Sequence, residues 1–409
     1  MTKAAAHKWE FRPRFRRNAF GWKSQPAIAR VKEAVSEIRT VGRSDELLAA
    51  EGAVLFLEKV SPALSQVDSS SGAIGTAVNS AVAQLVEVIA NAPADETTRE
   101  RWLERLWDAY QEDDIPYIER LGDYWGELCA SKEVASQWAD QLIGICRLAW
   151  SPDPKLRGFF KGTTNCLSAL LAAGRYDELL ALLEMAPYRM WHYRQFGVRA
   201  LVTLGNRAEA IRYAEDNPGL NDSPVAIARA CEEILLSSGL ADDAEEAYER
   251  YGLLANRAGT YLAWFRAVTR KYPHKTPADV LEDLVAHTPG EEGKWFAAAK
   301  DAKLFDEAIA LANRTPCSPQ TLTRAARDFA EKRPEFAVEA GMAALHWLVE
   351  GYGYEVTALD VSSAYSHTME AARNAGCEEE VRARIVELVG RESGKRFVVE
   401  VLRRGVGLR

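Results

Sequence analysis

"AAGRYDELLALLEMAP", residues 172–187, is one of five related stretches in the second half of this 409-residue chain. It opens on small residues, continues with acids and with leucines at helical spacing, and ends on a proline. The other copies occupy residues 203–218, 237–252, 274–289 and 301–316. The third position of each copy serves as a reference, and these references lie 31, 34, 37 and 27 residues apart: Gly174, Gly205, Gly239, Thr276 and Lys303.

The copies also end alike. Thirteen residues after the reference stands Pro187, Pro218, Gly252, Pro289 or Pro316. Proline and glycine both end helices, so we expect one short helix per copy that stops at the same place. The residues five, eight and nine positions after the reference share one apolar helix face: Leu179, Leu182, Leu183, Ala210, Tyr213, Ala214, Ala244, Ala247, Tyr248, Leu281, Leu284, Val285, Ala308, Leu311 and Ala312.

Acids follow the reference position in several copies, as Asp177 and Glu178 do. A catalytic carboxylate pair is one interpretation. Their recurrence at one offset favours another, in which they lie in the first helical turn and stabilise the helix dipole. A further apolar stripe precedes each copy, for example Leu167, Leu170 and Leu171, so the repeating unit is a helical hairpin. One hairpin cannot bury its apolar face alone, and stacking of the hairpins predicts an all-α solenoid.

"AAGRYDELLALLEMAP" and "LFDEAIALANRTP" resemble the turn and second helix of tetratricopeptide (TPR) repeats. The resemblance covers about residues 160–345. It departs from the family in a turn-to-proline distance about one helical turn shorter and in irregular repeat spacing. It implies a right-handed α-solenoid that binds a peptide or protein on a concave surface lined by the first helix of each hairpin.

The sequence pattern divides the chain into four segments. Residues 1–25 form a basic, aromatic arm, and residues 26–160 are irregularly helical, with Ser24 predicted to cap the first helix. Residues 161–345 carry the repeats. Residues 346–409 are expected to form a C-terminal helical cap, because Arg384 occupies a normally apolar repeat position and the outer face of a cap must be polar.

Composition and motifs argue against several functional classes. No stretch approaches the ~20 uninterrupted apolar residues of a membrane span. The six cysteines are scattered without zinc-site spacing, which predicts reduced core thiols in a cytoplasmic protein. Acids in residues 112–127, including Asp113, are expected to be solvated rather than metal ligands. His192 has no nucleophile or carboxylate near it in sequence. The sequence therefore predicts no enzyme, cofactor or metal.

Two helical segments combine aromatic and cationic side chains. If the first helices line one concave surface, these side chains form a groove for an acidic or C-terminal carboxylate ligand. The alternative is that the aromatics belong to the core and the cations to a solvated face. The candidate partner-binding residues in these segments and in a nearby lysine stretch are Arg189, His192, Tyr193, Arg199, Tyr261, Arg266 and Lys294.

The arm "KWEFRPRFRRNAFGW", residues 8–22, differs in charge from the rest of the chain. Residues 1–32 hold nine Lys/Arg and one acid, a net charge of +8. The whole chain has a net charge of −8, so residues 33–409 carry −16. Aromatic and polar residues alternate, which predicts an extended segment. Three interpretations stay open: the arm docks on its own acidic body, it binds a partner protein or second subunit, or it binds nucleic acid. The candidate arm contacts are Arg12, Arg14, Arg16 and Arg17.

Overall fold

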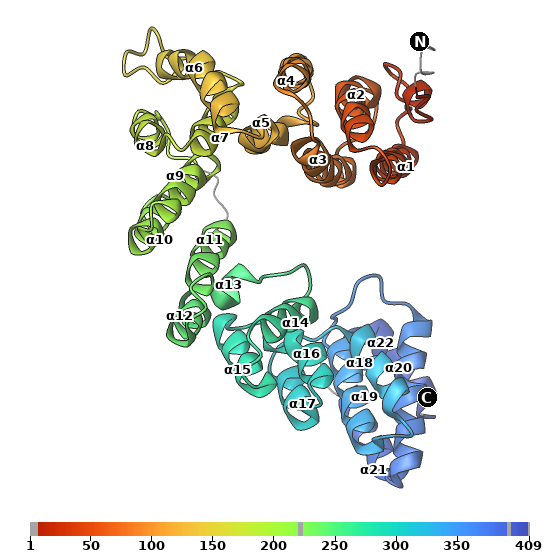
Figure 1. Cartoon of the computed structure of the whole chain (residues 1–409). Helices are drawn as coiled ribbons and strands as arrows, with labels where there is room; N and C mark the ends of the chain where they lie inside the picture. The colour runs from red at the N-terminus through yellow and green to blue at the C-terminus, as the bar shows by residue number, and fades with distance from the viewer. Residues whose placement is uncertain (1–6, 220–223, 391–393, 408–409) are drawn as a thin grey trace. The chain divides into compact units, whose positions relative to one another are not determined.

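The computed structural model describes residues 7–219, 224–390 and 394–407, and within these ranges it contains helices and no strand (Figure 1). The all-α prediction is confirmed. The chain divides into two compact units, Met1–Ser223 and Pro224–Arg409. This division falls inside the segment 161–345 that the repeat pattern defines. The four segments therefore describe sequence pattern, and the two units describe packing.

Helices of the first unit alternate between two packed rows. In one row α1 packs on α3, α3 on α5, α5 on α7 and α7 on α9, while α2 packs on α4 in the other (Figure 1). The helices are α1 Ser24–Gly42, α2 Glu46–Leu64, α3 Ala73–Asn91, α4 Glu96–Gln111, α5 Trp125–Cys129, α6 Lys132–Ala149, α7 Thr163–Ala173, α8 Tyr176–Glu184, α9 Trp191–Thr203 and α10 Arg207–Glu215, with 3-10 turns η1 Arg12–Arg14 and η2 Glu119–Tyr124. The serine predicted as a cap is instead the first residue of α1, and Lys23 precedes it without a side-chain cap.

The second unit, Pro224–Arg409, continues the hairpins and ends in longer helices. Its helices are α11 Pro224–Leu236, α12 Ala241–Ala247, α13 Leu253–Ala255, α14 Tyr261–Lys271, α15 Pro277–His287, α16 Phe296–Asp301, α17 Phe305–Arg314, α18 Pro319–Phe329, α19 Pro334–Val349, α20 Ala358–Ala375, α21 Glu378–Val389 and α22 Arg396–Gly405, with a π turn η3 Tyr248–Gly252 and a 3-10 turn η4 Glu292–Trp295. Arg384 pairs with Glu339 of α19 through two bonds of 2.6 and 2.8 Å.

Four of the five repeat copies form a helix that ends before its proline, namely α8, α10, α15 and α17. The third copy differs, because its helix continues through η3 to Ala255. The prediction that it stops at Gly252 is wrong. A Cβ at Gly252 would lie 3.0 Å from Tyr272 Cε2, so this glycine admits a tyrosine ring instead of ending the helix. None of the fifteen predicted apolar positions is exposed.

The predicted reference positions are true turns in four copies. Gly174, Gly205 and Gly239 have φ of 75°, 85° and 72°, and Lys303 has φ of 63°. This left-handed conformation closes the preceding helix and favours glycine. Thr276 instead caps α15, accepting from Asp279 N at 3.2 Å.

The N-terminal arm is folded onto its own unit, and the predicted extended form is wrong. Trp9, Phe11 and Phe15 are 5%, 2% and 1% exposed, and residues Arg12–Arg14 form a 3-10 turn. Phe11 and Phe15 both contact the Phe56 ring, with centroid distances of 5.7 and 5.0 Å. Side chains four residues apart share one face of a helical turn, so the alternating pattern was compatible with either conformation.

Carboxylates of α1 hold the arm's backbone and one of its cations. Glu37 accepts from the backbone N–H groups of Glu10 at 2.7 Å and Phe11 at 3.1 Å. Arg14 pairs with Glu33 at 3.0 Å. The docking of the arm on its own body, one of the three interpretations, is what the structure contains.

Helix α3 is long and apolar enough to span a membrane by length and composition, and among the described residues it alone passes that test. It packs against α1, α2 and α5 within the first unit. Its buried residues are Ile74, Val78, Ala81, Val82, Leu85, Val86 and Ile89.

Candidate peptide-binding groove

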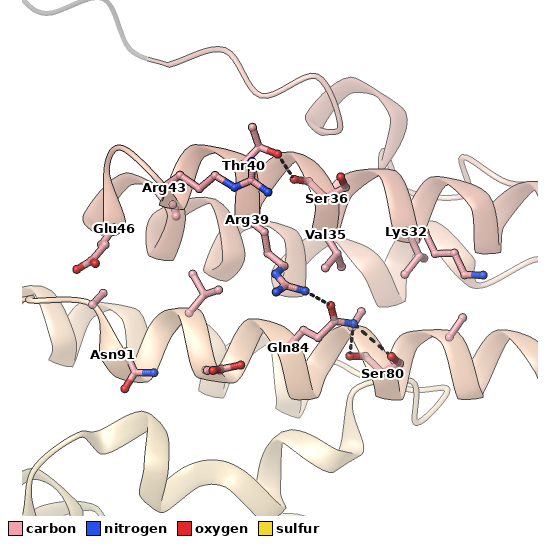
Figure 2. Close-up of a pocket in the computed structure, with 18 residues that line it drawn as sticks. Lys32, Val35, Ser36, Arg39, Thr40, Arg43, Glu46, Ser80, Gln84 and Asn91 are labelled. Carbon is pink, nitrogen blue, oxygen red and sulfur yellow. Dashed lines mark hydrogen bonds between the residues drawn. The ribbon is translucent and has the colours of Figure 1, made fainter.

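A groove of about 770 Å³ runs between α1 and α3 in the first unit. The two helices lie side by side, with Lys32 and Ser80 toward one end and Glu46 and Asn91 at the other (Figure 2). Small apolar residues of both helices, such as Val35 and Ala81, form part of its lining. Small side chains leave room for a ligand main chain between the helices.

Polar side chains line the walls of the groove. Arg39 donates from Nη1 to Gln84 Oε1 at 3.0 Å, and Gln84 donates from Nε2 to Ser80 O at 3.1 Å (Figure 2). Thr40 donates to Ser36 O of its own helix at 2.8 Å. The Arg39–Gln84 bond joins the two walls and leaves the other guanidinium N–H groups without a protein acceptor in the described part of the chain.

Three cations face this groove: Lys32 and Arg39 of α1, and Arg43, the residue that follows the helix as its C-cap. All three are exposed, and none has an ion-pair partner within the described ranges. The lining carboxylates Glu46 and Glu87 are also exposed and also without an ion pair there. Cations without an internal counter-charge are available to an anionic ligand, whereas paired cations must first be released.

The spacing of the α1 residues explains how one helix serves both the core and the groove. Its buried residues recur at helical spacing: Ala27, Val31, Ala34, Val35 and Ile38. The three cations are seven and four residues apart, so they fall within roughly 40° of each other around the helix axis. Sequence reasoning missed these residues, although the same seven-and-four spacing of cations beside a buried stripe is visible in the sequence.

A second pocket, of about 480 Å³, adjoins the groove where α3 meets α5 and the start of α6. It shares Glu87 and Asn91 with the groove, and it adds Glu127 and Lys132. Both pockets lie along the row of helices α1, α3, α5 and α7. The lining of the second pocket therefore carries the unpaired acids Glu87 and Glu127 and a single lysine.

The candidate arginines of the arm have unequal surroundings. Arg14 pairs with Glu33, and Arg16 donates from Nε to Pro13 O at 3.1 Å. Arg12 and Arg17 are exposed and have no ion pair in the part of the chain that the structure describes. Trp9, Phe11 and Phe15 are buried, whereas Trp22 is 72% exposed, so most of the arm's rings are withdrawn from base stacking and Trp22 remains accessible.

The candidates near α9 do not share one helix. The helix begins at Trp191, so exposed Arg189 belongs to the preceding loop rather than to the predicted first helix. Tyr193 is half-buried against Trp150, with a centroid distance of 5.4 Å. Arg199 is exposed and lies 5.9 Å from the Phe196 ring.

His192 has neighbours that the sequence did not reveal. Thr164 Oγ1 lies 3.0 Å from its Nε2, and Asp123 Oδ1 lies 4.0 Å from its Nδ1. The prediction that no carboxylate stands near it holds only along the sequence, because η2 and α7 bring these groups together. A hydroxyl, an imidazole and a carboxylate form general-base sites, but here Thr164 is buried, with 6% of its surface exposed, and the carboxylate is beyond hydrogen-bond length.

The candidates of the second unit are already paired. Arg266 makes two bonds to Asp301, of 3.0 and 2.5 Å, which hold the pKa of Asp301 below its usual range. Lys294 bonds Glu291 at 2.6 Å, and Tyr261 donates to the same carboxylate, so the pKa of Glu291 is lowered as well. A ligand would have to displace these acids. The two candidate groups belong to separate units.

The prediction that the acids of residues 112–127 are solvated is wrong for Asp113. It is 3% exposed and accepts from the Ile118 N–H at 2.8 Å, the Tyr117 N–H at 3.3 Å and the Ser61 hydroxyl. Burial raises the pKa of Asp113 despite these bonds. The sequence missed it because Ser61 comes from α2, far from Asp113 along the chain.

No cluster of three or more metal-ligating side chains occurs among the described residues. All six cysteines carry free thiols. No model of a known protein family matches the chain, and no curated protein matches it significantly.

Proposed function

We propose that the chain is a non-catalytic, cytoplasmic interaction module that binds an acidic peptide segment of a partner protein between α1 and α3. Its helical hairpins would form a TPR-like, right-handed α-solenoid, with the groove on the surface lined by first helices. The observation that carries the proposal is the set of three groove cations, Lys32, Arg39 and Arg43, without internal counter-charges. Carboxylates form short, charge-assisted hydrogen bonds with such cations.

The groove has the dimensions and lining that a peptide requires. Its volume of about 770 Å³ is within the usual range for ligand pockets. Its floor is apolar and its walls present hydroxyl and amide groups, such as those of Ser36, Ser80 and Asn91, which can bond a peptide backbone. The arrangement suits an extended segment rather than a folded domain.

Nucleic acid on the N-terminal arm is the alternative function. Phosphate contact needs clustered cations, and ring stacking contributes to single-strand binding. Arg12 and Arg17 supply charge, but Trp9, Phe11 and Phe15 are buried in the fold, which leaves Trp22 as the arm's largely exposed indole. The peptide groove therefore has the stronger support.

Fluorescence anisotropy tests the proposal with the full chain and a labelled hexaglutamate peptide at low salt. Arg39→Glu/Arg43→Glu should weaken binding at least about tenfold. Arg12→Glu/Arg17→Glu is the matched control, because it changes net charge equally outside the groove lining, and it should retain most of the affinity. Equal losses in both variants would show unspecific charge attraction and refute the groove. A labelled oligothymidylate probe bound only through the arm would support the alternative.

A further inference from the structure

The three cations are arranged in a line, and this arrangement bears on the ligand's sequence. With a rise of about 1.5 Å per residue, Lys32 and Arg39 lie about 10 Å apart along α1, and Arg39 and Arg43 about 6 Å apart. A peptide in the extended polyproline II conformation advances about 3.1 Å per residue with three residues per turn, so residues three apart face the same side. The two gaps therefore match about three and about two peptide residues.

The groove is also polarised along its length. The unpaired cations begin at Lys32, whereas Glu46 lies at the other end of the groove, where Asn91 also lies (Figure 2). Glu87 lines both the groove and the adjoining pocket, and Glu127 also lines that pocket. A carboxylate placed there would meet like charge, and a lysine or arginine would meet opposite charge.

We infer that the ligand is an extended acidic segment with carboxylates at intervals of three and two residues, followed by a basic residue at the Glu87 end. This inference rests on the proposed peptide binding and adds its order of charges. The spacing distinguishes such a segment from a simple acidic cluster, because the three cations span about 16 Å along the helix axis whereas three contiguous peptide residues span about 6 Å. The position of the basic residue sets which end of the segment lies near Arg43.

The order of charges can be tested with labelled peptides of one composition. One carries the pattern E-S-A-E-S-E-S-K, a second has this order reversed, and a third has its three glutamates contiguous. Two orders are needed because the charges do not set the chain direction of the peptide. One ordered peptide should bind about tenfold more tightly than the clustered one.

Charge reversal tests the polarity separately. In Glu87→Lys the best ordered peptide should lose affinity, and its variant with glutamate in place of lysine should gain it. Glu104→Lys is the matched control, because Glu104 is exposed on α4 and outside the groove lining, and it should leave the preference unchanged.

Two outcomes would overturn the inference in different ways. If ordered and clustered peptides bind equally and both depend on Arg39 and Arg43, the groove binds acidic peptides without reading their order. If none of the peptides binds, the inference and the proposed function both fail.

Discussion

Replacing Gly52 by alanine should loosen the N-terminal arm. Gly52 lies within α2, and the indole of Trp9 rests directly on it. An added Cβ would lie 2.5 Å from Trp9 Cη2 and 2.8 Å from Cε2, closer than real Cβ contacts. The indole must therefore move. Phe11 and Phe15, the next buried residues of the arm, are then expected to be displaced with it.

Two opposing effects set the size of the change. Alanine in place of glycine inside a helix stabilises by roughly 0.5–1 kcal/mol. Overpacking a buried site costs roughly 1–3 kcal/mol. For Gly52→Ala the second effect dominates, and we expect a net loss of about 1–2 kcal/mol. Gly144 of α6 has nothing within 4 Å of an added Cβ, so Gly144→Ala should show the gain alone.

Amide hydrogen exchange followed by mass spectrometry suits this comparison, because a two-unit chain need not unfold in one step. Gly52→Ala should speed exchange in the arm and in α2, and Gly144→Ala should slow it in α6. In a Trp9→Ala background the sign at Gly52 should reverse, since the clash is gone. Equal protection by both alanines in the wild-type background would refute the docking of the arm.

Three further predictions concern single positions. Glu232, fully buried, accepts from Lys271, Tyr272 and Asn256, so Glu232→Ala should cost about 2–4 kcal/mol in urea unfolding, whereas exposed Glu233→Ala should change little. Lys303→Gly should raise the melting temperature, because removing a left-handed non-glycine residue gains about 1 kcal/mol. Burial opposes the ionisation of Glu51, but its bonds from Arg105 and Trp102 lower its pKa. The resulting stability is present above the unfolded pKa and lost as pH falls through the folded pKa, so Glu51→Gln should destabilise at pH 7 and approach wild type in acid denaturant titrations.

Local signals in the sequence predicted the elements of the fold. Helix-ending residues such as Pro187 and Pro218 act on neighbouring backbone, and apolar spacing reports the buried face of one helix at a time. Both signals depend only on residues within one or two helical turns of each other. The prediction for the third copy was wrong because glycine can either end a helix or make room for a neighbouring side chain. At Gly252 the second applies, and it depends on the Tyr272 ring, which is distant in sequence.

The candidate site depended on contacts between segments far apart in sequence. Arg39 and Gln84 meet only because α1 and α3 pack side by side. No sequence repeat in residues 26–160 predicts that pairing. The same holds for Asp113 with Ser61 and for His192 with Asp123. Charge in the sequence showed where cations are, but not which of them, such as Arg266, already have an acid beside them.

The position of the groove on α1 has a consequence for how its ligand preference can change. The groove-facing cations Lys32, Arg39 and Arg43 support no ion pair in the described chain, and exposed substitutions of this kind usually alter stability by less than about 0.5 kcal/mol. The buried stripe of the same helix can stay constant while these positions vary. Divergence, or an engineer, could therefore exchange one recognised charge pattern for another by altering a single helix, without rebuilding the scaffold that presents it.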